Sequence, residues 1–279
     1  MAMVINTNVA SINSQRQLTS TNNALSTSME RLSSGLRVNS AKDDAAGLAI
    51  GDRMNSQIRG MTVATRNASD GISMAQTAEA AMGEITSTMQ RMRDLSVQAA
   101  NTGAVTGGDR DKLQEEFSQL NAELTRIVQN TEFNGKKIIN GSLSGGINIQ
   151  VGANTTADNQ IAVSVDNLAA TLSLVTKASI GSQASDTGAL SAVANIDEAI
   201  EAIDTARAKL GAIQNRFTTT ISNLQSSIEN QSAAKSRIMD TDFAAETASL
   251  SRNQILQQAG TAMLSQANQA PNAVLGLLR

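Results

Sequence analysis

Two long segments with helical apolar spacing constrain the fold of this 279-residue chain more than any other feature. Between Met54 and Ala99, apolar residues recur at steps of three, four and seven: Ile58, Met61, Ala68, Ile72, Ala75, Met82, Ile85, Met89 and Met92. Similar spacing joins Ile196, Ile200, Ile203, Leu210, Ile213, Phe217, Ile221, Leu224 and Ile228. Such spacing predicts helices with one buried stripe. A helix over 192–237 is about 70 Å long at ~1.5 Å per residue, so its stripe needs a partner along its whole length.

The other segments complete the prediction of a mainly α fold. After Gly107-Gly108 the stripe restarts as Leu113, Phe117, Leu120, Leu124 and Ile127. Turn signals at Asn134-Gly135 and Asn140-Gly141 precede two alternating runs: Ile147, Ile149, Val151 and Ile161, Val163, Val165. These runs predict a β-hairpin, and residues 168–191 lack periodicity and predict a loop or irregular cap. The expected fold is an elongated antiparallel helical bundle or coiled coil with a small β-hairpin region and paired terminal helices.

Composition excludes several classes of function. The chain has no His, Cys, Trp or Tyr, and its 22 Lys and Arg nearly balance 25 Asp and Glu. Imidazole bases, thiolate nucleophiles, His-containing zinc sites and iron–sulfur sites are therefore excluded. Near-neutral charge with few aromatic residues argues against nucleic-acid binding. We expect no enzymatic activity, cofactor or metal, although a hydrolase based on carboxylates is an alternative.

Targeting signals are also missing from the sequence. No window approaches 18 uncharged apolar residues, so no membrane insertion is expected. No basic region precedes a continuous apolar run near the first residue, so no secretory signal peptide is expected. Taken alone, the lack of both kinds of segment predicts a cytoplasmic protein.

The two ends of the chain carry apolar stripes with very little charge. Residues 1–29 contain only Arg16 as a charged residue, and residues 243–278 contain only Glu246 and Arg252. Amide and hydroxyl side chains can be buried at lower desolvation cost than charges. The ends could pair as an ordinary coiled coil, as in a soluble adaptor, or form the buried interior of a polymer. The candidate polymerisation residues are Ile5, Val9, Ile12, Leu18, Leu25, Leu256, Met263, Val274 and Leu277.

The same ends carry long ordered motifs that resemble bacterial flagellin. These motifs are Ile5–Asn8, Glu30–Ile50, Asn253–Leu264 and Gln266–Gln269, with Leu210–Phe217 between them. The resemblance covers about the first 140 and the last 90 residues. A hook–filament junction protein is an alternative, because such proteins share terminal helices of this kind.

The resemblance implies an extracellular filament subunit that transmits motor torque as part of a helical propeller. It implies export in an unfolded state through the flagellar type III apparatus, without a cleaved signal. Its implied partners are other copies of the chain, an export chaperone, and the cap and hook–filament junction proteins. The short middle of the chain implies a core-only subunit. Its expected parts are an N-terminal inner-core helix, the N-terminal part of the outer core, a long outer-core helix and a C-terminal inner-core helix: 1–43, 44–192, 193–236 and 237–279.

A charged segment follows the N-terminal helix. The resemblance implies that it connects the inner and outer core, where ion pairs would fix the orientation of subunits. Its residues are Arg37, Asn39, Lys42, Asp43 and Asp44. Catalysis is disfavoured, because adjacent residues on a helix point about 100° apart. The structural alternative is a helix start, with Ser40 as the N-cap and Asp43 in the first turn.

Residues Gln90–Gln98 resemble the stretch where the host flagellin-sensing Toll-like receptor binds some flagellins. The resemblance implies a recognition site at Arg91 and Leu95, one turn apart on a helix, with Glu116 as the matching acidic position. Alternatively, these residues pack against neighbouring subunits and Arg91 pairs with an acid.

Overall fold

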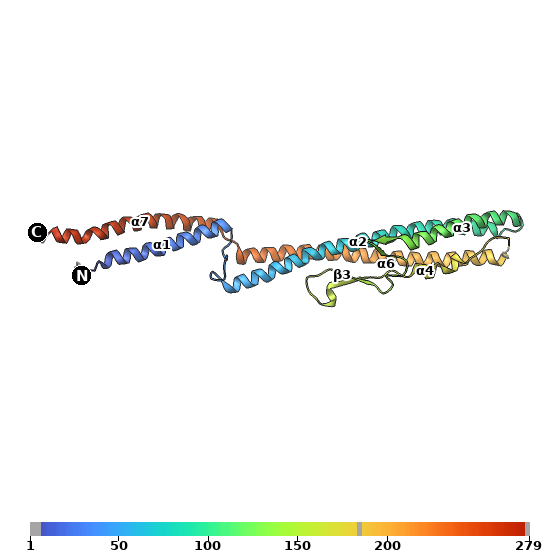
Figure 1. Ribbon diagram of the computed structural model, residues 1–279, viewed down its shortest axis with the longest axis horizontal. Helices are drawn as coiled ribbons and strands as arrows, with labels where there is room; N and C mark the ends of the chain where they lie inside the picture. Colours follow the sequence, from blue (N-terminus) through green and yellow to red (C-terminus); the bar gives the residue numbers. More distant parts are fainter. Residues whose placement is uncertain (1–6, 183–185, 277–279) are drawn as a thin grey trace. The chain divides into compact units, whose positions relative to one another are not determined.

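The computed structural model describes residues 7–182 and 186–276, with side chains described for 7–182 and 187–269. The helices are α1 (Val9–Ser34), α2 (Ala45–Ala99), α3 (Gly107–Asn130), α4 (Leu168–Thr171), α5 (Ser173–Thr176), α6 (Asp186–Met239) and α7 (Phe243–Gly276) (Figure 1). The strands are β1 (Glu132–Phe133), β2 (Lys136–Lys137), β3 (Ile147–Gln150) and β4 (Gln160–Val163), with a 3₁₀ turn at Ala157–Asn159. The mainly α prediction is confirmed.

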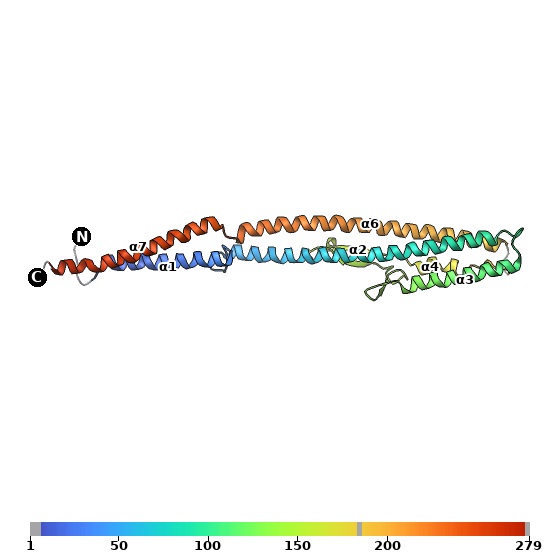
Figure 2. The same cartoon turned by 90° about the horizontal axis from the view of Figure 1, so that it is seen from above.

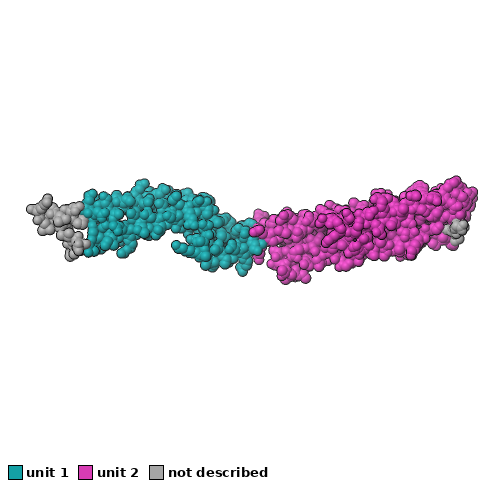
Figure 3. Space-filling model, in the orientation of Figure 1, with its two compact units in different colours: residues 1–56, 230–279 teal, residues 57–229 magenta. Residues whose placement is uncertain are grey.

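The chain divides into two compact units (Figure 3). Unit 1 comprises residues 1–56 and 230–279, and unit 2 comprises residues 57–229. Helices α2 and α6 each contribute residues to both units.

Unit 2 is built on α2, α3 and α6, which lie side by side (Figures 1 and 2). Arg93 on α2 pairs with Asp197 on α6 at 2.6 Å, and Glu79 accepts a hydrogen bond from Gln214 at 2.9 Å, so α2 and α6 are antiparallel. The predicted stripes form the core, whose most buried members include Met82, Ile85, Met89, Met92, Phe117, Leu124, Ile203, Leu210 and Phe217. The predicted long helices with one buried stripe are therefore confirmed.

Helix α6 begins earlier than the apolar spacing predicted. Residues 186–191 belong to the helix, and Ala189 and Ala192 are 0% and 1% exposed. These alanines continue the buried stripe of Ile196 by steps of three and four. The predicted loop was wrong here, because small side chains form a close-packed seam without a strong hydrophobic signal.

The predicted β-hairpin is confirmed and packs against α2. Strands β3 and β4 are antiparallel, with Ile147 opposite Val163 and Ile149 opposite Ile161. A Cβ atom on Gly71 of α2 would lie 2.8 Å from both Ile149 Cδ1 and Phe217 Cζ. The missing side chain at Gly71 thus lets the hairpin approach α2.

Residues 168–182 are more ordered than the predicted irregular cap. Helices α4 and α5 contact α3, and Leu168, Leu172, Val175 and Ile180 are buried. Gln114 Oε1 on α3 accepts hydrogen bonds from the N–H groups of Ile180 (2.6 Å) and Gly181 (3.0 Å). Asp111 Oδ1 accepts one from the Ser182 N–H at 2.8 Å. Side chains of α3 therefore fix this segment.

Asp111 should make part of the stability depend on pH. Hydrogen bonds from the Ser182 hydroxyl and then its backbone N–H lower the pKa of Asp111 below its ordinary value. A lowered pKa stabilises the fold above the unfolded pKa of about 4, and this contribution is lost as the pH falls through the folded pKa. We expect Asp111→Asn to be less stable than the parent chain at pH 7, with a smaller difference at pH 3 than at pH 7. Urea unfolding at both pH values measures it, and a difference independent of pH would contradict the assignment.

Candidate functional site

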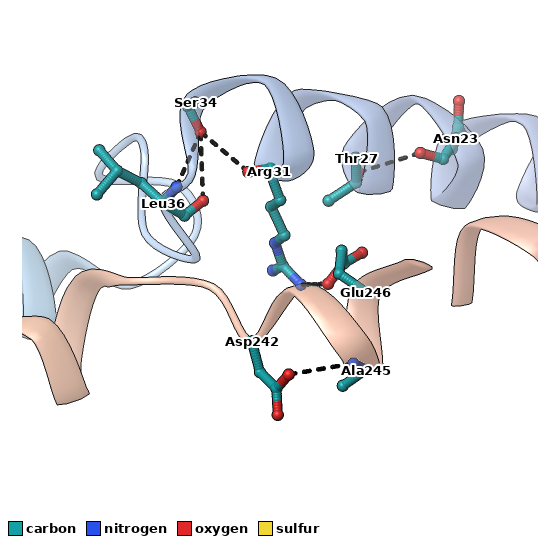
Figure 4. Close-up of polar contacts among 8 residues, drawn as sticks. All are labelled: Asn23, Thr27, Arg31, Ser34, Leu36, Asp242, Ala245 and Glu246. Atoms are coloured by element: carbon teal, nitrogen blue, oxygen red, sulfur yellow. Dashed lines mark hydrogen bonds and ion pairs between the residues drawn. The ribbon is translucent and has the colours of Figure 1, made fainter. Parts of the chain in front are cut away.

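The terminal helices α1 and α7 form an antiparallel pair within unit 1. Asn8 Nδ2 donates to the Ala267 carbonyl at 2.7 Å, and Gln257 Nε2 donates to Asn22 Oδ1 at 2.9 Å. At the other end of the pair, Arg31 lies 3.8 Å from Glu246 (Figure 4). Most of these contacts are between uncharged polar groups.

The seam between α1 and α7 is made largely of small and polar side chains. On α1 a series of buried and half-buried positions follows steps of three and four: Ser11, Ser14, Leu18, Thr21, Leu25, Ser28 and Leu32. On α7 between residues 253 and 267, the half-buried positions are Asn253, Gln257, Gly260, Leu264 and Ala267. A Cβ on Gly260 would lie 3.3 Å from Leu18 Cδ1. Small seam residues allow the helices to approach closely, and Cα atoms of α1 and α7 come within 8 Å of each other along the pair.

Several large apolar side chains of the terminal pair are exposed outside the seam. On α7, Ile255, Leu256 and Met263 are 66%, 47% and 62% exposed, and we call these three residues the α7 apolar stripe. On α1, Val9 and Ile12 are 64% and 48% exposed. Exposed apolar residues grouped on one face indicate an interaction surface.

The structure thus divides the predicted polymerisation residues into two groups. Val9, Ile12, Leu256 and Met263 are exposed, whereas Leu18 and Leu25 lie half-buried in the seam. Ile5 and Leu277 lie outside the described residues, and the side chain of Val274 is not described. The sequence prediction missed the hydroxyl-rich seam, because an apolar period does not detect serine and threonine. It also omitted Ile255 from the stripe.

The charged segment after α1 forms a turn. The predicted helix start, with Ser40 as the N-cap and Asp43 in the first turn, was wrong. Helix α2 begins at Ala45, and the Asp44 carboxylate accepts a hydrogen bond from the Gly47 N–H at 2.8 Å, as an N-cap does. Asp43 instead closes the preceding turn by accepting from the Asn39 N–H (3.2 Å) and the Ser40 N–H (2.9 Å). A further hydrogen bond from the Ser40 hydroxyl is the main cause that lowers the pKa of Asp43. Ser40 is therefore not the N-cap.

Other residues of this segment bind the end of α6, within unit 1. Arg37 donates from its backbone N–H to the Met239 carbonyl at 2.7 Å and from Nη2 to the Ile238 carbonyl at 2.6 Å. A cation at a helix C-terminus is favourable, because the last carbonyls have no partner inside the helix. Asn39 donates to Glu30 at 2.8 Å, and Lys42 is exposed.

The candidate receptor site has an exposed ion pair above a buried leucine. Arg91 on α2 donates from Nε and Nη2 to Glu116 Oε1 on α3 at 2.8 and 2.6 Å. The two side chains are 55% and 44% exposed. Leu95 is 1% exposed and belongs to the core of unit 2. The structure therefore brings Arg91 and Glu116 together and places Leu95 beneath the surface.

The described residues hold no group of three or more acidic side chains arranged to bind a metal ion. Across the same part of the chain, none of the helices has the length and apolar character needed to span a membrane.

Comparison with known proteins decides the family. Residues 5–144 match the family model for the bacterial flagellin N-terminal helical region, and residues 193–278 match the model for the C-terminal helical region. The chain belongs to the bacterial flagellin family. This flagellin is 45% identical over 278 residues to a flagellin of Halalkalibacterium halodurans, which it matches over 99% of its own length and 100% of the relative.

Two further relatives match this flagellin over nearly its full length. Flagellin of Bacillus subtilis is 42% identical, with 99% of this chain and all of the relative covered, and flagellin D of Vibrio cholerae is 40% identical, with both chains fully covered. This flagellin is therefore a structural subunit of the extracellular flagellar filament, which copies of the chain build by polymerisation. The family is structural rather than enzymatic. Membership of the flagellin family corrects the expectation of a cytoplasmic protein, which rested only on the lack of a signal peptide and of a membrane segment.

Proposed function

We propose that the α1–α7 pair is the principal surface through which this flagellin polymerises. The apolar residues Val9, Ile12, Leu256 and Met263 would be covered by neighbouring copies, together with Ile5, Val274 and Leu277. Leu18 and Leu25 would hold the pair together. In this proposal residues 1–43 and 237–279 form the inner core, and residues 44–192 and 193–236 form the outer core.

The observation that carries the proposal is the outward position of the α7 apolar stripe. Its residues are 47–66% exposed on a helix that has few charges to keep it dispersed in water. Burying apolar area contributes about 25 cal/mol per Å², and the neutral amides beside the stripe can be hydrogen-bonded within an interface. A subunit whose contacts join two different surfaces builds an open helical array, which can transmit torque along its length.

Removal of residues 256–279 tests this proposal. The truncated chain should not polymerise when seeded with filament fragments, because most of the α7 stripe is lost. Unit 2 should still fold, because its described core comes from residues 57–229. Negative-stain microscopy detects filaments, and circular dichroism with urea unfolding monitors unit 2. Normal filaments from the truncated chain would contradict the proposal.

We also propose the export route and partners that accompany this role. The polar seam buries little apolar surface, so the terminal pair should open at low cost. That property suits passage through the flagellar type III apparatus in an unfolded state, without a cleaved signal. An export chaperone, the cap and the hook–filament junction proteins would meet the same terminal surfaces.

We further propose that Arg91 and Glu116 form a contact site for the host flagellin-sensing Toll-like receptor. Both side chains are about half-exposed and held by their ion pair. Leu95 would support this site from the core. Arg91→Ala and Glu116→Ala should each lower receptor-reporter activation at least about tenfold, as loss of a central interface residue does. Arg126→Ala is the matched control, because it breaks a comparable exposed pair, with Glu123. Equal responses from all three variants would contradict the proposal.

A further inference from the structure

An exposed basic stripe lies on the part of α2 that belongs to unit 2. Four other arginines of this unit are ion-paired: Arg91, Arg93, Arg126 and Arg207. Arg59 and Arg66 are exposed, and neither side chain has an ion pair or hydrogen bond among the described residues. Val63 lies between them and is 45% exposed. Residues at i, i+4 and i+7 share one helix face, so Arg59, Val63 and Arg66 form one surface, the basic stripe.

An acidic stretch lies on α6. Asp197, Glu198, Glu201 and Asp204 are four carboxylates within eight residues, and all are exposed. Asp197 pairs with Arg93 at 2.6 Å, and Asp204 lies 3.6 Å from Arg207. Within the part of the chain that the structure describes, Glu198 and Glu201 have no cationic partner. Leu190, seven residues before Asp197, is 58% exposed.

Within the acidic stretch, Glu198 and Glu201 repel each other, and no cation among the described residues pairs with either of them. Glu201 lies three or four residues from each of the other three carboxylates of the stretch. Like charges at this spacing on a helix destabilise it. A cation from another molecule would remove this repulsion, and Arg93 cannot do so because it is already bound to Asp197.

The basic stripe and the acidic stretch lie too far apart to meet within one molecule. The acidic stretch lies beside Arg93 of α2, as the Arg93–Asp197 pair shows. Val63, at the centre of the basic stripe, precedes Arg93 by thirty residues on the same helix. At a rise of ~1.5 Å per residue this separates the two surfaces by about 45 Å. Both surfaces belong to unit 2, so one copy of the chain presents them at a fixed spacing.

We propose that the basic stripe of one copy docks onto the acidic stretch of the next copy, with the two molecules staggered by about 45 Å along their helices. The opposite charges of the two surfaces are complementary, and Val63 and Leu190 supply apolar contacts beside them. A contact of either surface with its own equivalent would bring like charges together. When each copy docks in this way onto the next, the contact joins two different surfaces and can be repeated as an open head-to-tail array. This contact is separate from the α1–α7 surface and goes beyond the function proposed for it.

Charge exchange between two full-length variants tests this contact. The first variant is Arg59→Glu with Arg66→Glu, and the second is Glu198→Arg with Glu201→Arg. Each is assembled alone from filament seeds, then the two are assembled as an equimolar mixture, and finally all four substitutions are combined in one chain. Sedimentation gives the critical concentration of each sample, and circular dichroism with urea unfolding confirms that the variants are folded.

Each variant alone should raise the critical concentration at least about tenfold, because every contact then joins like charges. The mixture and the four-substitution chain should return to within about threefold of the parent chain, because both restore opposite charges across the contact. Unchanged assembly of both single variants would overturn the proposal. Impaired assembly that neither the mixture nor the four-substitution chain restores would overturn it as well. The substitutions leave α7 intact, so this test and the truncation of residues 256–279 can fail independently.

Discussion

Replacing Ile255, Leu256 and Met263 together by serine should raise the critical concentration for polymerisation about a thousandfold. Burial of one large apolar side chain contributes about 1.5–3 kcal/mol, so three such losses at the lower figure total about 4.5 kcal/mol, and 1.4 kcal/mol corresponds to a factor of ten. These residues are exposed and contribute little to the folded monomer. The critical concentration is measured by sedimentation of seeded assemblies.

A matched variant separates loss of apolar surface from general damage to α7. Ile255→Val, Leu256→Met and Met263→Leu keep the stripe apolar at nearly the same volume, and such exchanges are usually tolerated. This variant should polymerise within about threefold of the parent chain. If the serine variant polymerised as well as this one, the α7 apolar stripe could not be an assembly surface.

The second large effect is expected in the core of unit 2. Phe217 is 0% exposed and lies where α6 meets Gly71 of α2 and Ile149 of the hairpin. Phe217→Ala removes these contacts and leaves a cavity, so it should lower the free energy of unfolding of unit 2 by about 3–5 kcal/mol. Urea unfolding followed by circular dichroism measures the change.

Phe243→Ala is the control for this core substitution. Phe243 begins α7, lies outside unit 2 and is 55% exposed. Its replacement should therefore change the free energy of unfolding of unit 2 by less than about 0.5 kcal/mol. Equal losses from the two alanine variants would show that Phe217 does not hold the three elements together.

The long helices and the hairpin were predictable because they depend on large apolar side chains at regular spacing. Met82, Met89 and Phe217 lie in the core as their periods predicted. The β3–β4 hairpin followed from strict alternation, since one face of a strand pair must be buried.

Small side chains account for the parts of the fold that could not be predicted. The N-terminal turns of α6 are buried through Ala189 and Ala192, and the α1–α7 seam buries Ser11, Thr21 and Ser28. Alanine, serine and threonine contribute little to a hydrophobic period, yet they allow close helix packing. The sequence therefore showed the apolar stripes of the terminal helices but not which face of each helix would be covered by the other.

The candidate sites were harder to derive than the fold. Leu95 follows Arg91 by one helical turn, which suggested that both side chains share an exposed face. Leu95 instead lies three residues after Met92 and four before Ala99, so it belongs to their buried stripe. The start of α2 at Ala45 depends on which of several adjacent polar residues accepts the capping hydrogen bond. Ser40, Asp43 and Asp44 are all suitable N-cap or first-turn residues, so composition alone could not choose among them.

Methionine oxidation offers the most direct test of the claim that assembly covers the α7 apolar stripe. Met263 is 62% exposed in the single chain, whereas Met82 is fully buried in unit 2. Peroxide oxidises exposed methionines to the sulfoxide, and mass spectrometry of peptides gives the rate at each position. Met263 should oxidise rapidly in the dispersed chain and at least about tenfold more slowly in filaments, while Met82 stays slow in both. Equal rates for Met263 in the dispersed chain and in filaments would contradict the claim.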